Sequence, residues 1–191
     1  DGPIEAQVMS SRDLRTWGRP NRDPIIPTGK AGSWDDGCIF TASTMQTTAT
    51  DHTIYYGGTN MPHGFNTTTP LQNTVGKIAK ATWRRDGFVS LHNEGNDEGY
   101  VVTKIVRFSG ATTLKVNANM FTGGTLKVEA LNSSGTPIAG FTYATATAVI
   151  GDQMSATVSW TAGSNISSLA NTDIKLKFYI KGGDVYSYWF Q

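Results

Sequence analysis

Residues 174–180 read Ile-Lys-Leu-Lys-Phe-Tyr-Ile, so that apolar and polar side chains alternate for most of the segment. A period of two places one set of side chains on a buried face and the other in water, as in an antiparallel sheet. Residues 114–117, Leu-Lys-Val-Asn, repeat the pattern. These stretches predict antiparallel β-strands.

Short β-rich runs between turn residues continue in both directions from this stretch. The 21 glycines and the many Thr and Asn residues are poor helix formers. About seven strands in roughly 90 residues predict an antiparallel β-sandwich of the jelly-roll kind. The strands expected in this second half are 100–108, 113–119, 125–131, 140–145, 153–160, 173–180 and 184–190.

The first half offers fewer strands. A connection with Pro20, Pro24 and Pro27 separates the first strand from the rest, and proline cannot donate to a sheet ladder. The stretch 92–99 is the most polar in the chain, so we expect a boundary there, with domains at 1–92 and 100–191. The strands expected in the first half are 5–10, 38–45, 53–57, 77–83 and 88–91.

Composition argues against several classes of function. Sixteen basic and fifteen acidic residues give a net charge of +1, which gives no support to nucleic-acid binding or to a polybasic membrane surface. No apolar run approaches the roughly 20 residues of a membrane-spanning helix. The single cysteine, Cys38, rules out an intramolecular disulfide and a multi-cysteine zinc site.

Three sequons for N-glycosylation begin at Asn66, Asn132 and Asn165. Together with the abundance of Thr, Ser and Gly, they favour a secreted, extracellular glycoprotein. The chain begins Asp-Gly-Pro without an initiator Met, so we expect a mature or excised piece of a longer protein.

A succession of motifs then suggests a family. It runs SSRDLRTW (10–17), RPNRDPIIPTGKAGSWDDG (19–37), IYYGGTNMPHG (54–64) and GKIAKATWRRDGFVSL (76–91). This succession resembles the last blade of the five-bladed β-propeller glycoside hydrolases of families 32 and 43, in which a C-terminal β-sandwich follows. The resemblance implies a terminal blade segment at 1–92, with the earlier blades outside this sequence.

The resemblance also bears on catalysis. Glycoside hydrolysis normally requires two carboxylates flanking the scissile bond. In the propeller hydrolases these come mainly from the earlier blades, so no catalytic residue can be assigned here. We expect the chain alone to be inactive.

Candidate sugar-binding residues gather in two loops. The motif Trp34-Asp35-Asp36-Gly37 would place one carboxylate on sugar hydroxyls and offer Trp34 for ring stacking; the alternative is an Asp-Gly turn with a structural Trp. His63 stands in a Gly/Pro/Asn loop, where it would hydrogen-bond a ligand or remain solvated. No metal site is expected from these residues.

Other motifs favour structure over function. Residues 84–87, Arg-Arg-Asp-Gly, indicate a turn whose Arg pairs with a neighbouring carboxylate. The aromatic strand 186–190 is either core or an exposed strip that could hold a sugar. The large aromatics expected in the core are Trp17, Trp83 and Trp160. Three single acids stand in turns, where carboxylate oxygens can hold a structural calcium ion, although the sequence has no calcium-binding motif and predicts no cofactor. They are Asp152, Asp173 and Asp184.

Three functions follow from these features. The first is the C-terminal portion of a secreted glycoside-hydrolase-like protein. The second is a non-catalytic carbohydrate-binding module, and the third is a structural or adhesive extracellular subunit. The expected partners are a carbohydrate, and the missing blades or other copies of the chain, because an unpaired blade exposes edges and faces.

Overall fold

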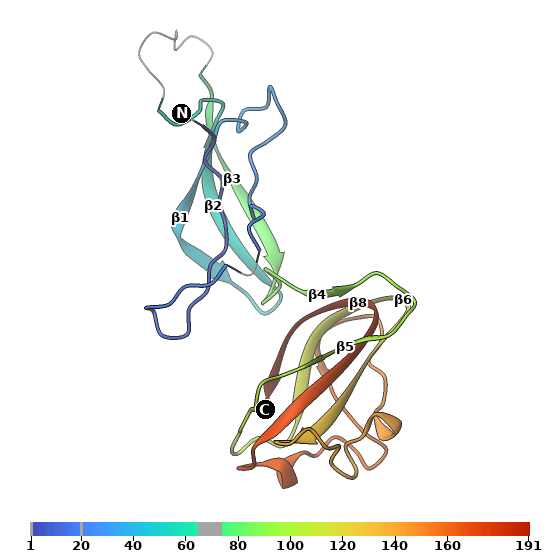
Figure 1. Ribbon diagram of the computed structural model, residues 1–191. Helices are drawn as coiled ribbons and strands as arrows, with labels where there is room; N and C mark the ends of the chain where they lie inside the picture. Colours follow the sequence, from blue (N-terminus) through green and yellow to red (C-terminus); the bar gives the residue numbers. More distant parts are fainter. Residues whose placement is uncertain (1, 20, 65–73) are drawn as a thin grey trace. The chain divides into compact units, whose positions relative to one another are not determined.

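The computed structural model describes residues 2–19, 21–64 and 74–191. Within these residues nearly all regular structure is β, and every pairing between the named strands is antiparallel, which confirms the predicted all-β class. Contacts divide the chain into unit 1, Asp1–Val89, and unit 2, Ser90–Gln191. Each unit has a β-sheet of its own (Figure 1).

Unit 1 is built on a three-stranded sheet in the order β1-β2-β3. The strands are β1 (Cys38–Thr47), β2 (Asp51–Thr59) and β3 (Gly76–Arg84). The three strands predicted within these segments are confirmed, each somewhat longer than expected. A register shift interrupts the β1–β2 pairing between Thr41 and Met45.

The prediction of a strand at 5–10 was wrong. This segment makes only isolated bridges, such as Ala6 with Ile26 and Ser10 with Gly18. The N–H groups of Ile25 and Ile26 both donate to the Ala6 carbonyl. Prolines flank this pair, at 24 and 27, and supply no N–H with which to extend the ladder.

The strand expected at 88–91 was also wrong, although the turn before it is present. Asp86 has a φ of 55°, and the Gly87 N–H donates to the Arg84 carbonyl at 2.9 Å. The chain does not return along β3. Instead, the Phe88 ring stacks on the His52 ring with centroids 5.0 Å apart.

One face of the unit 1 sheet carries large apolar side chains that are exposed to solvent. Phe40 and Ile78 both pair with Gly57, and Tyr55 lies two residues from it on β2, so all three share a face. Their exposed fractions are 52%, 81% and 46%. Among the described residues of unit 1, only three apolar side chains are buried: Ile26, Cys38 and Ile39. Unit 1 therefore has almost no core of its own.

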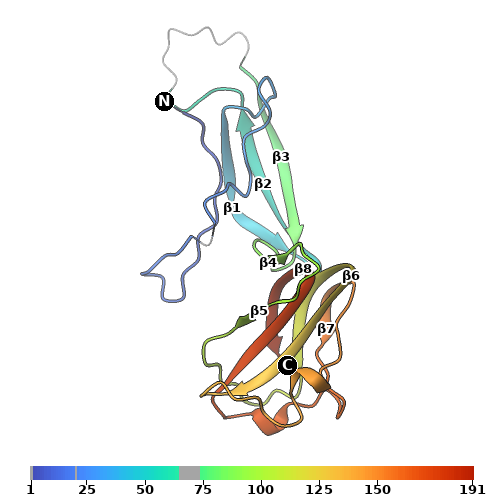
Figure 2. The same cartoon turned by 45° about the vertical axis from the view of Figure 1, so that its right-hand side comes forward.

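Unit 2 contains one sheet in the order β4-β8-β6-β7, with β5 also pairing with β8. Two strands are very long, and Figure 2 shows them side by side. Each spans two of the strands predicted from the sequence. The elements are β4 (Leu91–Asn93), β5 (Gly99–Val102), β6 (Leu114–Asn132), β7 (Asp152–Thr157) and β8 (Ile174–Phe190).

Three of the remaining predictions for unit 2 need correction. The strand expected at 100–108 ends at Val102, and the one expected at 153–160 ends at Thr157. The segment expected as a strand at 140–145 instead contains a short 3-10 helix, η2 (Tyr143–Thr145). A second, η3 (Ser167–Leu169), precedes β8. The terminal aromatics are half-buried, and Tyr188 packs on the core beside Phe178 and Phe190.

The core of unit 2 is extensive, and its members come from both long strands and from the loops around them. Trp160 is 3% exposed, and its indole N–H donates to the Val128 carbonyl at 3.0 Å, which confirms its predicted place in the core. In unit 1, by contrast, Trp17 is half exposed because it lies in the surface loop that the Ser10–Gly18 bridge closes, so that prediction was wrong. Trp83 is half-buried against Phe88.

Candidate functional site

The loop before β1 lies against β2 and carries the first candidate residues. The Trp34 ring stacks on the Tyr56 ring, with centroids 6.0 Å apart and planes 14° from parallel. Gly58 makes this contact possible, since a Cβ there would come within 2.6 Å of the Trp34 ring. Trp34 is half-buried, so this ring has a structural role as well as an accessible part.

Asp35 is held in the same cluster. Its carboxylate accepts a hydrogen bond from the Ser33 hydroxyl at 2.8 Å and a long one, 3.5 Å, from the Tyr56 phenol. Its backbone carbonyl accepts from the Gly29 N–H at 3.1 Å. Burial, and then the Asp35 charge, raise the pKa of Tyr56, so the phenol stays a neutral donor. We call Trp34, Asp35 and Tyr56 the Trp34 cluster.

The structure does not gather all the predicted candidates in this cluster. The neighbouring carboxylate, Asp36, accepts instead from the Gly32 N–H at 2.6 Å. His63 is exposed, and its backbone N–H donates to the Gly2 carbonyl at 2.9 Å. Among the described residues, its side chain makes no hydrogen bond, ion pair or ring contact with the Trp34 cluster. Tyr56 was not predicted, although the Tyr-Tyr-Gly-Gly sequence of β2 marks a strand that another segment approaches closely.

Two of the three glycosylation candidates lie at the surface of unit 2. Asn66 lies outside the described residues. Asn132 and Asn165 are both exposed. The Asn132 side-chain oxygen accepts from the Ser134 hydroxyl and from the Thr136 N–H, and that of Asn165 accepts from the Ser167 N–H. Both asparagines thus cap tight turns at the surface.

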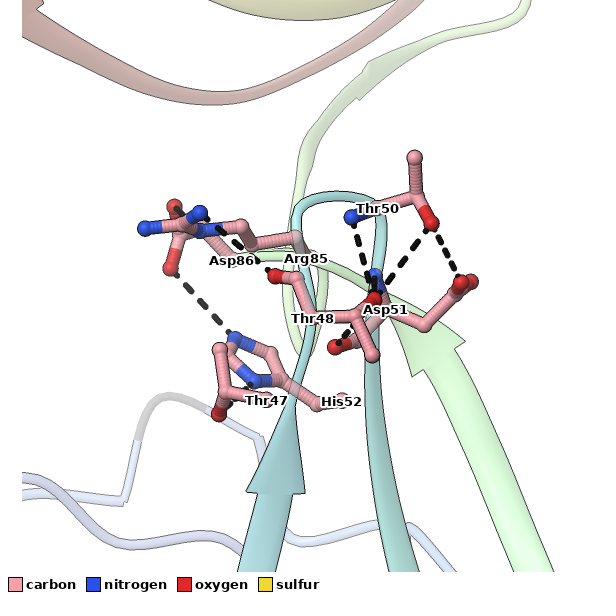
Figure 3. Close-up of polar contacts among 7 residues, drawn as sticks. All are labelled: Thr47, Thr48, Thr50, Asp51, His52, Arg85 and Asp86. Carbon is pink, nitrogen blue, oxygen red and sulfur yellow. Dashed lines mark hydrogen bonds and ion pairs between the residues drawn. The ribbon is translucent and has the colours of Figure 1, made fainter.

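A second polar cluster in unit 1 surrounds a buried histidine (Figure 3). His52 is 7% exposed; one ring nitrogen lies 2.8 Å from the Thr47 hydroxyl and the other 3.4 Å from the Asp86 carboxylate. Asp86 also pairs with Arg85 at 3.8 Å, which confirms the predicted Arg–carboxylate turn. Because Phe88 stacks on the same ring, this cluster ties the turn after β3 to the β1–β2 hairpin.

In unit 2, a row of polar residues crosses the sheet. Asn119 on β6 pairs with Asp184 on one side and with Asp152 on the other. His92 donates from Nδ1 to the Asp184 carboxylate at 2.9 Å, and hydrogen bonds to Asp184 and Glu94 raise the pKa of His92. Within the described residues, no group of three or more His, Cys, Asp or Glu side chains is arranged to hold a metal ion.

The third acid considered for calcium, Asp173, pairs with Arg107 at 3.7 Å.

Comparisons with protein-family models, curated proteins and solved structures find no match to this chain. Among the helices of the described residues, none has the length and apolar character needed to cross a membrane. The chemistry of the clusters themselves is therefore the basis for a function.

Proposed function

We propose that the chain is the C-terminal portion of a secreted carbohydrate-active protein and that the Trp34 cluster contributes to its sugar site. The observation that carries the proposal is Asp35, a carboxylate held by two hydroxyl donors beside a pair of stacked aromatic rings. A half-exposed carboxylate accepts hydrogen bonds from vicinal sugar hydroxyls, and an aromatic ring beside it packs on sugar C–H groups.

The proposal also accounts for the missing core of unit 1. The face that carries Phe40, Tyr55 and Ile78 would be covered by the sheet of a preceding propeller blade, as the family resemblance implies. An apolar face of this kind is costly to leave in water. The observed scarcity of buried apolar residues in unit 1 supports a blade segment that depends on a neighbour.

The cluster favours binding over hydrolysis by this chain alone. The Trp34 cluster contains a single carboxylate, since Asp36 bonds elsewhere, whereas hydrolysis normally needs two carboxylates flanking the bond. A non-catalytic carbohydrate-binding role is therefore the second candidate function. In the first, the acid and base come from blades outside this sequence.

A glycan array with three variants tests the proposal. We expect neutral oligosaccharides to be retained by the wild-type chain and lost with Asp35→Asn and Trp34→Ala. Asp23→Asn is the matched control, since Asp23 is an exposed carboxylate that bonds only Asn21 among the described residues. Retention that is unchanged in both cluster variants, or no retention at all, would refute a sugar site at Trp34.

A further inference from the structure

Three tyrosines meet on the outer face of unit 2, on the side of the sheet away from its core. Tyr100 on β5 pairs directly with Tyr179 on β8, and their ring centroids lie 6.2 Å apart. Tyr143, from η2, meets Tyr179 edge to face at 4.6 Å. Tyr100 is 66% exposed. Tyrosines of this cluster therefore present aromatic surface to solvent.

Lysines stand among these rings. The Lys177 ammonium lies 3.9 Å from the Tyr100 ring centroid and 4.7 Å from that of Tyr179. The Lys127 ammonium lies 4.5 Å from the Tyr143 ring. Because side chains alternate along a strand, two further β8 lysines, at 175 and 181, project from the same face as Lys177. In the part of the chain that the structure describes, none of the four lysines forms an ion pair.

The carboxylates of this face are occupied in holding the rings. Glu129 is 6% exposed and accepts from the Tyr179 phenol at 2.7 Å and from the Tyr143 N–H at 3.1 Å. Glu98 accepts from the Tyr143 phenol at 3.2 Å. Both acids thus orient tyrosines, while the ammonium groups of Lys127 and Lys177 lie against the tyrosines themselves.

We propose that this tyrosine–lysine face binds an anionic polysaccharide, one that carries uronate or sulfate groups. Pyranose rings would pack on the exposed part of Tyr100, and the acidic groups would pair with Lys177 and Lys127. Four lysines against two occupied glutamates give the face a positive excess. The exposed rings favour a polyanion that has ring faces to pack, as a polysaccharide has, over one that is held by charge alone.

The proposal is independent of the Trp34 cluster, which lies in the other unit. The pKa of Lys177 is raised, first by its hydrogen bond to Tyr179, so its ammonium is charged at neutral pH, where a uronate is also ionised. The binding should weaken with salt, because paired charges near the surface are screened.

Titration calorimetry with defined polymers tests the proposal on the whole chain. Polygalacturonate supplies carboxylates and dextran sulfate supplies sulfates; methyl-esterified polygalacturonate and plain dextran are their neutral counterparts. We expect binding of at least one charged polymer and at least about tenfold weaker binding of its neutral counterpart. Tyr100→Ala and Lys177→Gln should each weaken binding about tenfold or more.

Two control variants show whether binding depends on this face. Lys77→Gln and Lys80→Gln each remove one exposed lysine of unit 1 and should leave binding within about twofold of wild type. Circular dichroism melts confirm that each variant is folded. Equal binding of polyaspartate or of a DNA duplex, an unchanged isotherm for Tyr100→Ala, or no binding of either charged polymer would overturn the proposal.

Discussion

Substituting alanine at Gly58 should dislodge the Trp34 cluster without altering any of its members. A Cβ at this position would lie 2.6 Å from the Trp34 ring and 2.8 Å from the Cβ of Asp35. Ordinary carbon contacts begin near about 3.5 Å, so the loop must move by roughly 1 Å. The adjacent Gly57 is the matched control, because its Cβ would meet nothing within 4 Å. Neither glycine has a positive φ.

The magnitude follows from these two environments. Overpacking at a well-filled contact costs about 1–3 kcal/mol. Replacing a strand glycine in open space gains about 0.4–1 kcal/mol, because alanine restricts the unfolded chain. Both variants share this gain, so we expect Gly58→Ala to be about 1–3 kcal/mol less stable than Gly57→Ala. Urea unfolding followed by tryptophan fluorescence measures the difference, resolved for unit 1.

A spectroscopic titration gives a second readout for the same variant. Burial and the Asp35 charge raise the pKa of Tyr56, so moving the loop should return this pKa toward that of a free tyrosine. The reasoning would be refuted if Gly58→Ala matched Gly57→Ala in stability and left the Tyr56 titration unchanged.

Three further predictions follow from the two units. Because the pKa of His92 is raised, the stability that His92 contributes is present below about pH 6.5 and is lost as pH rises through the folded-state pKa. The wild type should therefore be more stable than His92→Gln at pH 6, and this advantage should shrink by pH 8. An advantage that stays constant over this range would contradict the prediction. Trp160→Ala should cost about 3–5 kcal/mol, and Trp160→Phe about 1–3 kcal/mol through the unpaired Val128 carbonyl; a neutral Trp160→Phe would count against the hydrogen bond. The chain alone should hydrolyse no aryl glycoside above background, and turnover that disappears in Asp35→Asn would reveal a complete active site.

Alternation of apolar and polar side chains was enough to predict the β class and most strands. From this pattern we predicted each of β6 and β8 as two separate strands, because the glycines in the middle of each are typical of turns. Gly123 has a φ of 78°, and a Cβ on Gly124 would lie 1.9 Å from the Gly182 carbonyl oxygen. These glycines permit a bulge where two strands approach closely. Only the pairing of β6 with β8, distant in sequence, distinguishes a bulge from a turn.

The candidate site could be predicted only in part, for a similar reason. Trp34 and Asp35 are adjacent in sequence and stay together in space. Tyr56 joins them through the register of β2 and through the space that Gly58 leaves, neither of which a local motif encodes. The tyrosine–lysine face escaped prediction because its members come from three separate strands and a 3-10 helix.

The most direct test of the account is a titration of the chain with neutral oligosaccharides, monitored through the tryptophan indole N–H resonances by NMR. Trp→Phe variants assign the five signals, and the method detects binding as weak as about 1 mM, or about −4 kcal/mol. We predict that the Trp34 signal shifts and saturates, while that of buried Trp160 stays fixed. A Trp34 signal that does not move with any oligosaccharide would contradict a sugar site in unit 1.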